Sequence, residues 1–213
     1  CKTIHKNTMK KSIKEYIESL NTTTISDARK RAIQPLIEYI IEGKKKEEKV
    51  KLNFICTHNS RRSHLSQVWA KTMADYFGVK GIKCYSGGTE ATAVYKTVLE
   101  VLTTVGFEVT SIPNYQNPTY KVNFMEENCP MTLFSKRHND AYNPRENFAA
   151  VMTCNDADAN CPVILNATRL SLPYVDPKVH DNTDRETAGY EERSMQIATE
   201  MKYIFSQVKN ELT

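Results

Sequence analysis

The stretch of sequence that determines the fold is residues 50–78, VKLNFICTHNSRRSHLSQVWAKTMADYFG. Its first part is mostly apolar and ends at Cys56, a pattern that indicates a buried β-strand. A short polar segment follows. From Arg62 onward, apolar residues recur at helical spacing up to a glycine: Leu65, Val68, Trp69, Met73 and Phe77. The sequence therefore predicts a strand, a loop and a helix in direct succession.

Strands and helices keep alternating along the rest of the chain. Apolar segments over 82–88, 147–154 and 170–177 predict three more strands. Periodic segments over 93–106 and 189–212 predict two more helices. This alternation is typical of an α/β fold with a doubly wound parallel sheet flanked by helices.

Several polar or small residues fall where the predicted strands end, and such ends carry the binding sites of doubly wound sheets. These residues are Cys56, Gly87, Cys154 and Asp176. We therefore expect the functional site at this edge of the sheet. The Pro- and Asn-rich segment 110–147 shows no clear period, and we expect it to be an irregular insertion.

The amino-terminal region predicts two helices, over 9–20 and 27–43, with Pro35 either bending the second helix or marking its start. A charged linker, GKKKEEK, follows. The sequence thus divides into a helical extension with its linker, 1–46, and a catalytic domain, 47–213. The extension carries no chemical motif, and we expect it to serve packing or a homodimer contact.

The composition of the 213 residues is that of an ordinary globular protein, with 40% hydrophobic and 25% charged residues. No apolar run approaches the roughly 20 residues of a membrane-spanning helix, and the polar amino terminus does not resemble a secretion signal. The net charge of +4 comes partly from the solvated linker. We therefore expect a cytoplasmic protein without a nucleic-acid or membrane partner, in which cysteines are more often catalytic than disulfide-bonded.

Cys56 and the loop after it form a candidate anion site. Backbone N–H groups at a helix start bind anions, and Arg62 adds a planar guanidinium that can hold two oxygens of a tetrahedral oxyanion. The same field favours the thiolate of Cys56, a nucleophile facing the anion. The expected oxyanion-binding residues are Thr57, His58, Asn59, Ser60, Arg61, Arg62 and Ser63. Asn59 can adopt a left-handed turn, and Ser63 can donate to the thiolate.

A second cysteine pair lies on a polar segment, VMTCNDADANCPV, where a predicted strand ends. Small polar residues separate Cys154 from Cys161, which predicts a loop or a frayed helical turn. The spacing does not match a common zinc site, and no second pair with metal spacing accompanies it, so we expect no metal. The two cysteines either exchange disulfides, which needs a segment that can rearrange, or merely flank a turn.

The segment ICTHNSRRS resembles the phosphate loop of low-molecular-weight protein tyrosine phosphatases and of the related thioredoxin-coupled arsenate reductases. YSGGTEA, after the second predicted strand, is similar to the Ser-(Ala/Gly)-Gly turn of these proteins. The resemblance runs from about Val50 to the last helix and is interrupted by 110–147. Two residues depart from it: His58 stands where a glycine is usual, and Arg61 where many arsenate reductases have an extra cysteine.

The second cysteine segment resembles the redox helix of thioredoxin-coupled arsenate reductases, Cys-x-Asp-Ala-Asp-x-Asn-Cys-Pro, at every specified position. The resemblance implies that Cys154 attacks Cys56 after arsenate has bound to it, and that Cys161 then takes over the disulfide. It also implies that Asp176, in an Asp-Pro pair, is the general acid. Lys178 stands where tyrosine phosphatases of the family usually have an aromatic residue.

The leading hypothesis is therefore an arsenate reductase with a three-cysteine relay, with thioredoxin as reductant and no organic cofactor. One alternative is a phosphatase for phosphotyrosine or small phosphoesters, and another is a non-catalytic redox sensor or anion-binding regulator. Some members of the family bind potassium near the loop. Asn59 and Ser86 match that site, but Gln67 stands where a carboxylate is expected, which argues against it.

Overall fold

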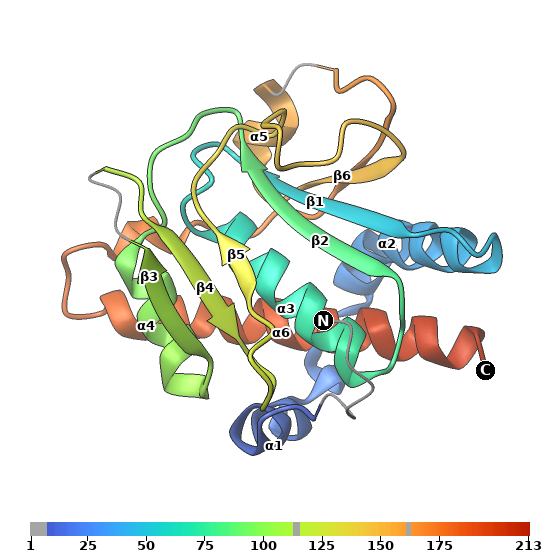
Figure 1. Ribbon diagram of the computed structural model, residues 1–213, viewed down its shortest axis with the longest axis horizontal. Coiled ribbons are helices and arrows are strands. Elements are labelled where there is room, and N and C mark those ends of the chain that lie inside the picture. Colours follow the sequence, from blue (N-terminus) through green and yellow to red (C-terminus); the bar gives the residue numbers. More distant parts are fainter. Residues whose placement is uncertain (1–7, 113–115, 161–162) are drawn as a thin grey trace.

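Four parallel strands form the centre of the protein in the computed structural model, which describes residues 8–112, 116–160 and 163–213 (Figure 1). The order across the sheet is β2-β1-β6-β7. The strands are β1 (Val50–Cys56), β2 (Ile82–Gly88), β6 (Phe148–Met152) and β7 (Ala167–Ser171). The chain winds outward in opposite directions from β1, as in a doubly wound sheet, and each neighbouring pair is parallel. The predicted fold class is confirmed.

Helices pack against the sheet, and the buried apolar side chains form two separate clusters. The helices are α1 (Lys11–Ser19), α2 (Asp27–Lys45), α3 (Arg62–Tyr76), α4 (Lys96–Val105), α5 (Asn155–Asn160) and α6 (Glu186–Glu211), with short 3-10 helices η1 (Thr22–Thr24) and η2 (Pro177–His180). Successive residues of a strand point to opposite faces. Leu52 and Phe54 of β1 therefore enter the large core with α3 and α6, whereas Ile55 joins a smaller cluster with Cys154 and Ala157.

The two amino-terminal helices belong to the same core as the sheet. Tyr16 of α1 stacks on Trp69 of α3, with ring centroids 5.5 Å apart. Helix α2 is capped by the side chain of Ser26 and continues through Pro35, so the proline does not mark its start. The apolar faces of both helices are buried by the rest of this chain. A homodimer contact through these helices, and the division of the chain after them, stay predictions.

The segment predicted to be irregular contains a second sheet, so that prediction is wrong for its first half. Three antiparallel strands pair in the order β3-β4-β5: β3 (Glu108–Ile112), β4 (Thr119–Asn123) and β5 (Met131–Leu133). Val122 and Leu133 are buried, but most of their neighbours are partly or fully exposed, which hides the apolar period. Such strands are selected by tertiary packing more than by propensity, and they leave a weak sequence signal.

One element near the candidate site also differs from prediction. Strand β7 covers residues 167–171 rather than 170–177, and an extended segment leads from it to Asp176. The polar segment after Cys154 is a short helix, α5, which is the helical one of the two predicted alternatives. Asp156 and Asp158 lie in its first turn, where negative side chains stabilise the positive end of the helix dipole.

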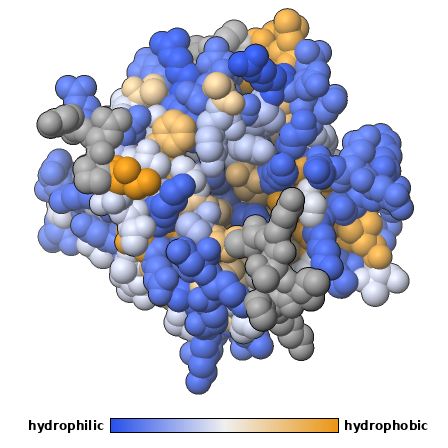
Figure 2. All heavy atoms as spheres, in the orientation of Figure 1, coloured by the Kyte–Doolittle hydropathy of each residue, from blue (hydrophilic) through white to orange (hydrophobic). Residues whose placement is uncertain are grey.

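Hydrophobic side chains on the face seen in Figure 2 are scattered among hydrophilic ones. None of the helices in the described ranges combines the length and the apolar character that a membrane span requires. The most exposed large hydrophobic side chains of the described residues are Val163 and Leu165, at 83% and 77%. Both follow the second cysteine segment directly, so the apolar exposure is greatest next to a candidate functional element.

Candidate active site

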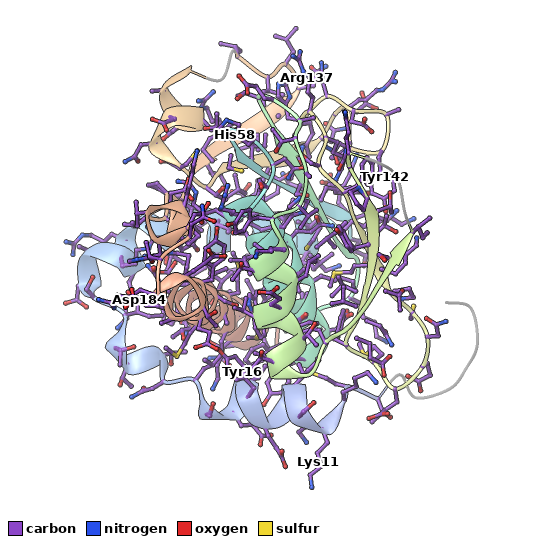
Figure 3. All side chains as sticks on the ribbon, turned by 90° about the vertical axis from the view of Figure 1, so that its left-hand side faces the viewer. Lys11, Tyr16, His58, Arg137, Tyr142 and Asp184 are labelled. Carbon is purple, nitrogen blue, oxygen red and sulfur yellow. The ribbon has the colours of Figure 1, made fainter. Side chains whose placement is uncertain are left out.

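Cys56 lies at the carboxyl end of β1, where the winding of the sheet reverses and where doubly wound sheets bind their ligands. Helix α3 begins at Arg62, so the predicted strand, loop and helix are all present. His58, in the loop, lies at the end of the molecule opposite to Tyr16 and Lys11 (Figure 3). The Cys56 side chain, at the base of the loop, is buried.

The inner side of the loop directs a hydroxyl group at the cysteine. Asn59 has a φ of 45°, in the left-handed region as predicted, and its amide nitrogen donates to Ser63 Oγ at 2.8 Å. Ser63 Oγ lies 3.1 Å from Cys56 Sγ. Because this oxygen already accepts from Asn59, its own hydrogen is free to donate to the sulfur. The loop thus places a hydrogen-bond donor beside the sulfur of Cys56.

The loop rests on the end of β2, which explains the glycine pair there. Glu90 N donates to Thr57 O at 2.8 Å. A Cβ atom on Gly88 would lie 2.7 Å from Thr57 O and 2.8 Å from Asn59 N, closer than side-chain carbons approach. Only glycine permits this contact between backbones. The sequence indicated Gly87 at the strand end, but the residue that the loop requires is Gly88.

Arg62 connects the loop to the predicted general acid. Its Nη1 donates to Tyr174 O at 3.0 Å, and its Nη2 donates to the Asp176 carboxylate. The second carboxylate oxygen accepts from Lys178 N at 3.1 Å. The buried Nε of Arg62 has no hydrogen-bond partner among the described residues. The structure therefore brings Asp176 to the loop and leaves a buried donor on Arg62 available for an anion.

The side chain of Arg61 is held outside the loop. Its Nε donates to Tyr190 OH and its Nη2 donates to Asp181 Oδ2, each at 2.5 Å. The guanidinium also lies 4.1 Å from the ring centroid of Tyr95. Of the two adjacent arginines, only Arg62 thus faces the candidate acid. A contribution of Arg61 to anion binding stays a prediction, and in this conformation its backbone N–H would have to supply it.

The outer side of the loop is positively charged. A pocket of about 440 Å³ next to it is lined by residues that include His58, Ser60, Arg61, Lys96 and Lys178. The His58 imidazole, 45% exposed, lies 3.7 Å from the Glu90 carboxylate. A concave surface with an excess of one sign of charge concentrates ligands of the opposite sign. This side of the loop therefore favours the approach of anions.

Cys154 lies against the same loop. Its Sγ is 3.6 Å from Thr57 Oγ1 and accepts a hydrogen bond from Ala157 N at 3.3 Å. Cys56 and Cys154 belong to one buried cluster, and Cys154 is only 1% exposed. The structure thus brings two of the three predicted cysteines together. Cys161 lies outside the described residues.

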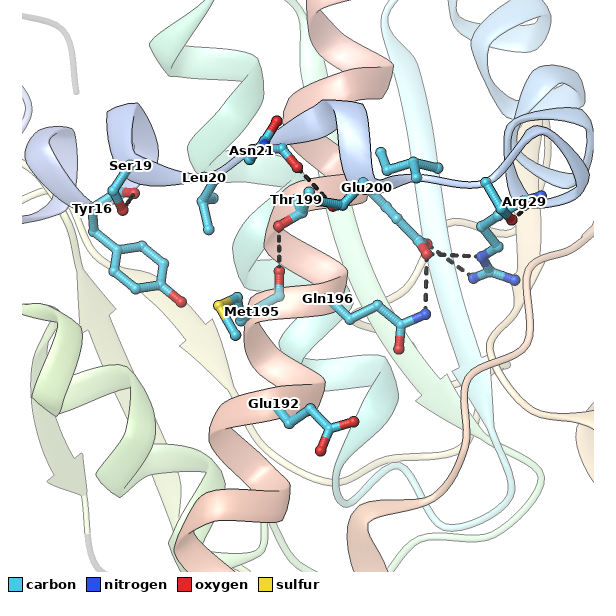
Figure 4. Close-up of a pocket in the computed structure, with 13 residues that line it drawn as sticks. Tyr16, Ser19, Leu20, Asn21, Arg29, Glu192, Met195, Gln196, Thr199 and Glu200 are labelled. Atoms are coloured by element: carbon cyan, nitrogen blue, oxygen red, sulfur yellow. Dashed lines mark hydrogen bonds and ion pairs between the residues drawn. The ribbon is translucent and has the colours of Figure 1, made fainter.

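The amino-terminal helices support the segment that precedes the Asp-Pro pair. Arg29 of α2 donates through Nε and Nη2 to the Glu200 carboxylate, at 2.8 and 2.9 Å (Figure 4). Its Nη1 donates to Pro173 O at 3.0 Å, and its guanidinium lies 4.7 Å from the ring centroid of Tyr174. Tyr174 is therefore held by Arg29 at its ring and by Arg62 at its carbonyl oxygen. No sequence pattern indicated this contact.

Sequence reasoning also missed two buried residues beneath the loop, His64 and Lys136. Their exposed fractions are 0% and 2%. Burial, together with the charge of Lys136, lowers the pKa of His64 to about 3, so its imidazole is neutral near pH 7. Burial lowers the pKa of Lys136 to about 8, which leaves it mostly charged at that pH. Lysine is rarely buried, and nothing in its local sequence indicated that this one would be.

The chain is similar in sequence to proteins of known family. Residues 51–125 match the family described as low molecular weight phosphotyrosine protein phosphatase. Arsenate reductase 2 of Staphylococcus epidermidis RP62A is 28% identical over 118 residues, which cover 55% of this chain and 70% of that protein. The arsenate reductase of Staphylococcus aureus strain Newman is 27% identical over 158 residues, which cover 73% of this chain and 88% of that protein.

The fold is similar to the solved structure of a low molecular weight phosphotyrosine phosphatase from Vibrio cholerae O395, and the alignment covers 74% of this chain and 95% of the chain of that protein. The sequence identity is 13% and the TM-score 0.48. The sequence match to the family contains the whole loop from Cys56 to Ser63. Cys154 and Asp176 lie beyond that match.

Proposed function

We propose that this chain, which is similar to low-molecular-weight phosphatases and to related arsenate reductases, is an enzyme that reduces arsenate to arsenite. The observation that carries the proposal is the position of Cys154, buried against the loop with its Sγ 3.6 Å from Thr57 Oγ1. Phosphoester hydrolysis needs no second thiol beside the nucleophile. Reduction of As(V) to As(III) does, because two electrons must come from thiols.

The first step captures arsenate on Cys56. Backbone N–H groups of the loop and the guanidinium of Arg62 bind the arsenate oxygens. The unpartnered Nε of Arg62 is available for one of them. The Cys56 thiolate attacks arsenic, an S–As bond forms, and one oxygen leaves as water after protonation. Asp176, held beside the loop by Arg62, is the proton donor.

The second step moves electrons from sulfur to arsenic. The Cys154 thiolate attacks Cys56 Sγ, a disulfide forms between the two residues, and the S–As bond breaks. The electron pair of that bond stays on arsenic, which leaves as arsenite. The hydrogen bond from Ala157 N, 3.3 Å from Cys154 Sγ, stabilises the thiolate that this attack requires.

The third step restores the nucleophile. The Cys161 thiolate attacks Cys154 Sγ, a Cys154–Cys161 disulfide forms, and Cys56 is released as a thiolate. An external dithiol then reduces the Cys154–Cys161 disulfide, and we propose thioredoxin for this role. Reduction by an external dithiol requires the Cys154–Cys161 disulfide to become accessible. Helix α5 must therefore change conformation, because Cys154 is buried in this structure.

Phosphoester hydrolysis is the second candidate function. Cys56, Arg62 and Asp176 alone supply a nucleophile, an anion clamp and a proton donor. The positive surface beside the loop suits a phosphoester as well as arsenate. In that reaction water attacks the phosphorylated cysteine, and neither Cys154 nor Cys161 takes part.

Turnover assays on one preparation separate the two functions. Arsenate-dependent oxidation of NADPH, in the presence of thioredoxin and thioredoxin reductase, measures the first. Hydrolysis of p-nitrophenyl phosphate measures the second. We expect arsenate turnover, and replacement of thioredoxin by glutathione with glutaredoxin identifies the reductant. Hydrolysis of p-nitrophenyl phosphate, without arsenate turnover in the presence of either reductant, would favour the phosphatase over the arsenate reductase.

A single-turnover experiment tests the order of the thiols. Cys161→Ser, oxidised by one equivalent of arsenate, should accumulate a Cys56–Cys154 disulfide, which peptide mass mapping detects. The wild-type protein should show Cys154–Cys161. The matched control is Cys84→Ser, because burial raises the pKa of the Cys84 thiol to about 12 and leaves it a poor nucleophile. Full arsenate turnover in Cys161→Ser would contradict the relay.

A further inference from the structure

Lys136 places a buried charge beneath the loop. Its ammonium lies 3.2 Å from Phe134 O and 3.5 Å from Ser86 Oγ, and 4.4 Å from the ring centroid of Phe134. Tyr142 contributes a second ring at 5.4 Å. Among the described residues, no carboxylate forms a direct ion pair with this ammonium. Asp140 attracts it from a greater distance but does not offset the effect of burial. A buried cation without a direct ion pair is costly, which suggests a role for its charge.

Hydrogen bonds connect this ammonium to the loop in one consistent direction. Asn59 O can only accept, so His64 Nε2, 2.8 Å away, carries the imidazole hydrogen. The neutral ring then accepts at Nδ1 from Ser86 Oγ, at 3.2 Å. Because the Ser86 hydroxyl donates its hydrogen to His64, its oxygen accepts from the Lys136 ammonium. Hydrogen bonds through two neutral side chains, Ser86 and His64, thus connect the Lys136 ammonium to Asn59 O.

The backbone of Lys136 holds the same asparagine from another side. Lys136 N donates to Asn59 Oδ1 at 2.9 Å, and Asn59 Nδ2 donates to Ser63 Oγ, which faces Cys56 Sγ. Two hydrogen-bond connections, one from the side chain of Lys136 and one from its backbone, therefore end at Asn59, the residue that gives the loop its left-handed turn. Loss of the ammonium would disturb the side-chain connection and leave the backbone connection intact.

The potassium site that the family resemblance implies does not fit these residues. Asn59 Oδ1 already accepts from Lys136 N, and Ser86 Oγ lies within reach of the Lys136 ammonium. Gln67 is neutral, and its amide nitrogen faces the carbonyl oxygens of Cys84 and Thr132 at 3.4 and 3.5 Å. Its Oε1 is buried and has no hydrogen-bond partner among the described residues, but one neutral amide oxygen does not supply the negative charge of the expected carboxylate.

We infer that the Lys136 ammonium is a built-in cation for this site, a positioning residue that takes the place of a bound monovalent cation. The inference rests on the proposed role of the Cys56–Ser63 loop in binding oxyanions. The ammonium orients His64 and Asn59 and adds positive charge below the loop, which stabilises both a thiolate at Cys56 and an anion above it. Oxyanion binding by this protein should accordingly be independent of potassium.

The test uses inorganic phosphate and the alkylation of Cys56 by iodoacetamide, followed by peptide mass mapping. Protection by phosphate gives its affinity, and the rate without phosphate reports the thiolate. Neither readout requires arsenate turnover. We expect the wild-type protein to behave identically in sodium and potassium chloride at equal ionic strength. Lys136→Met, which keeps an unbranched apolar side chain but no charge, should bind phosphate roughly tenfold more weakly and alkylate more slowly near pH 7.

Chemical rescue separates the charge from the shape of the side chain. Lys136→Ala removes the ammonium and leaves space, so potassium or methylammonium should restore part of the phosphate affinity and of the alkylation rate. A merely structural lysine would not respond to added cations. Lys121→Met is the matched control, because Lys121 Nζ bonds Thr132 Oγ1 at 2.7 Å in the second sheet. It should leave both readouts unchanged.

Two results would overturn the inference: stronger phosphate binding by the wild-type protein in potassium than in sodium, or wild-type affinity and alkylation rate in folded Lys136→Met. The first result decides even if the variants do not fold. A wild-type protein that phosphate does not protect would count against the proposed function instead. In that case the alkylation rates still decide whether Lys136 acts on Cys56.

Discussion

The loop from Cys56 to Ser63 and the segment from Cys154 to Asn160 direct two buried cysteines toward one place, but they are held very differently. Hydrogen bonds from several distant segments hold the loop. His58 O accepts from Thr92 Oγ1 at 3.2 Å and from Ser135 Oγ at 3.0 Å, and Ser60 O accepts from Tyr95 N at 3.0 Å. These contacts come in addition to the network through Asn59.

In the described part of the second segment, the side-chain contacts come from neighbouring strand β7. Helix α5 consists of 6 residues, too short to be stable on its own. Arg169 donates to Ala157 O at 3.2 Å and to Asp158 O, and Arg169 and Ser171 bond the Asp158 carboxylate at 3.2 and 2.5 Å, on the partly exposed surface. Val163 and Leu165, directly after it, are largely exposed. Local opening therefore costs less here than in the loop.

The difference corresponds to two kinds of chemistry. Binding and attack on a tetrahedral anion need donors held in one geometry, which the loop provides. Transfer of a disulfide needs a thiol that approaches, reacts and withdraws, which a weakly held short helix permits. Under the proposed function, the anion site would thus be held rigidly, and the segment that carries the electrons would be able to move.

Cys56→Ser should remove both activities. A serine hydroxyl is far harder to ionise than a thiol, and loss of an enzyme's nucleophile costs roughly 10⁴-fold or more in rate. Arsenate turnover and p-nitrophenyl phosphate hydrolysis are measured on the same sample, with circular dichroism as the check of folding. Appreciable turnover of either substrate by the folded variant would refute the assignment of the nucleophile.

Cys154→Ser should separate the two activities. Arsenate turnover should fall below detection, because no Cys154 thiolate is then present to attack Cys56 Sγ and displace arsenite. Hydrolysis, which ends with the attack of water, should stay near the wild-type rate. Peptide mapping after arsenate treatment should find no disulfide at Cys56. If arsenate turnover survives in this variant, the two regions do not divide binding and electron transfer between them.

Arg62→Lys should fold but turn over poorly. An ammonium cannot offer the planar fork that holds two oxygens of the anion, and loss of such a group lowers kcat/KM by about 10²- to 10³-fold. Arg61→Lys is the matched control, with a smaller expected loss, because that guanidinium bonds Tyr190 and Asp181 outside the loop. A reversed order of the two effects would make Arg61 the anion clamp.

Stability should respond to the loop and not to the helix. Asn59→Ala leaves the buried Lys136 N without its acceptor, removes the donor to Ser63 Oγ, and should lower the free energy of unfolding by about 1–3 kcal/mol. Asp158→Ala removes only partly exposed contacts and should cost at most about 1 kcal/mol. Urea unfolding measures both, and equal costs would contradict the contrast between the two regions.

Acid should weaken the loop through His64. Burial lowers the pKa of this histidine from 6.5 to about 3, so between those values the unfolded chain binds a proton that the folded chain does not. Stability from this group is complete above pH 6.5 and falls with decreasing pH, by up to about 1.4 kcal/mol per unit between pH 6 and pH 4. Urea unfolding of His64→Gln should show a shallower dependence on pH than the wild-type protein. An unchanged slope in His64→Gln would refute this role.

The fold class and the succession of strand, loop and helix around Cys56 could be predicted from the sequence alone. The apolar run ending at Cys56 and the helical period after Arg62 are local patterns, and local periodicity specifies a strand, a loop and a helix. The parallel sheet followed from the alternation of elements, and the left-handed turn at Asn59 from the residue type. The roles assigned to Cys154, Cys161 and Asp176 remain predictions that the family resemblance implied and the structure makes testable.

The contacts that support this loop could be found only in the tertiary structure, because they join residues far apart in the chain. Arg62 meets Asp176 across 114 positions, Arg29 meets Glu200 across 171, and the Lys136 backbone meets Asn59 across 77. A lysine in an irregular segment carries no sign that it will be buried, and an arginine pair does not reveal which member turns inward. Such choices depend on packing and on the pairing of buried charges, and both arise only when distant elements come together.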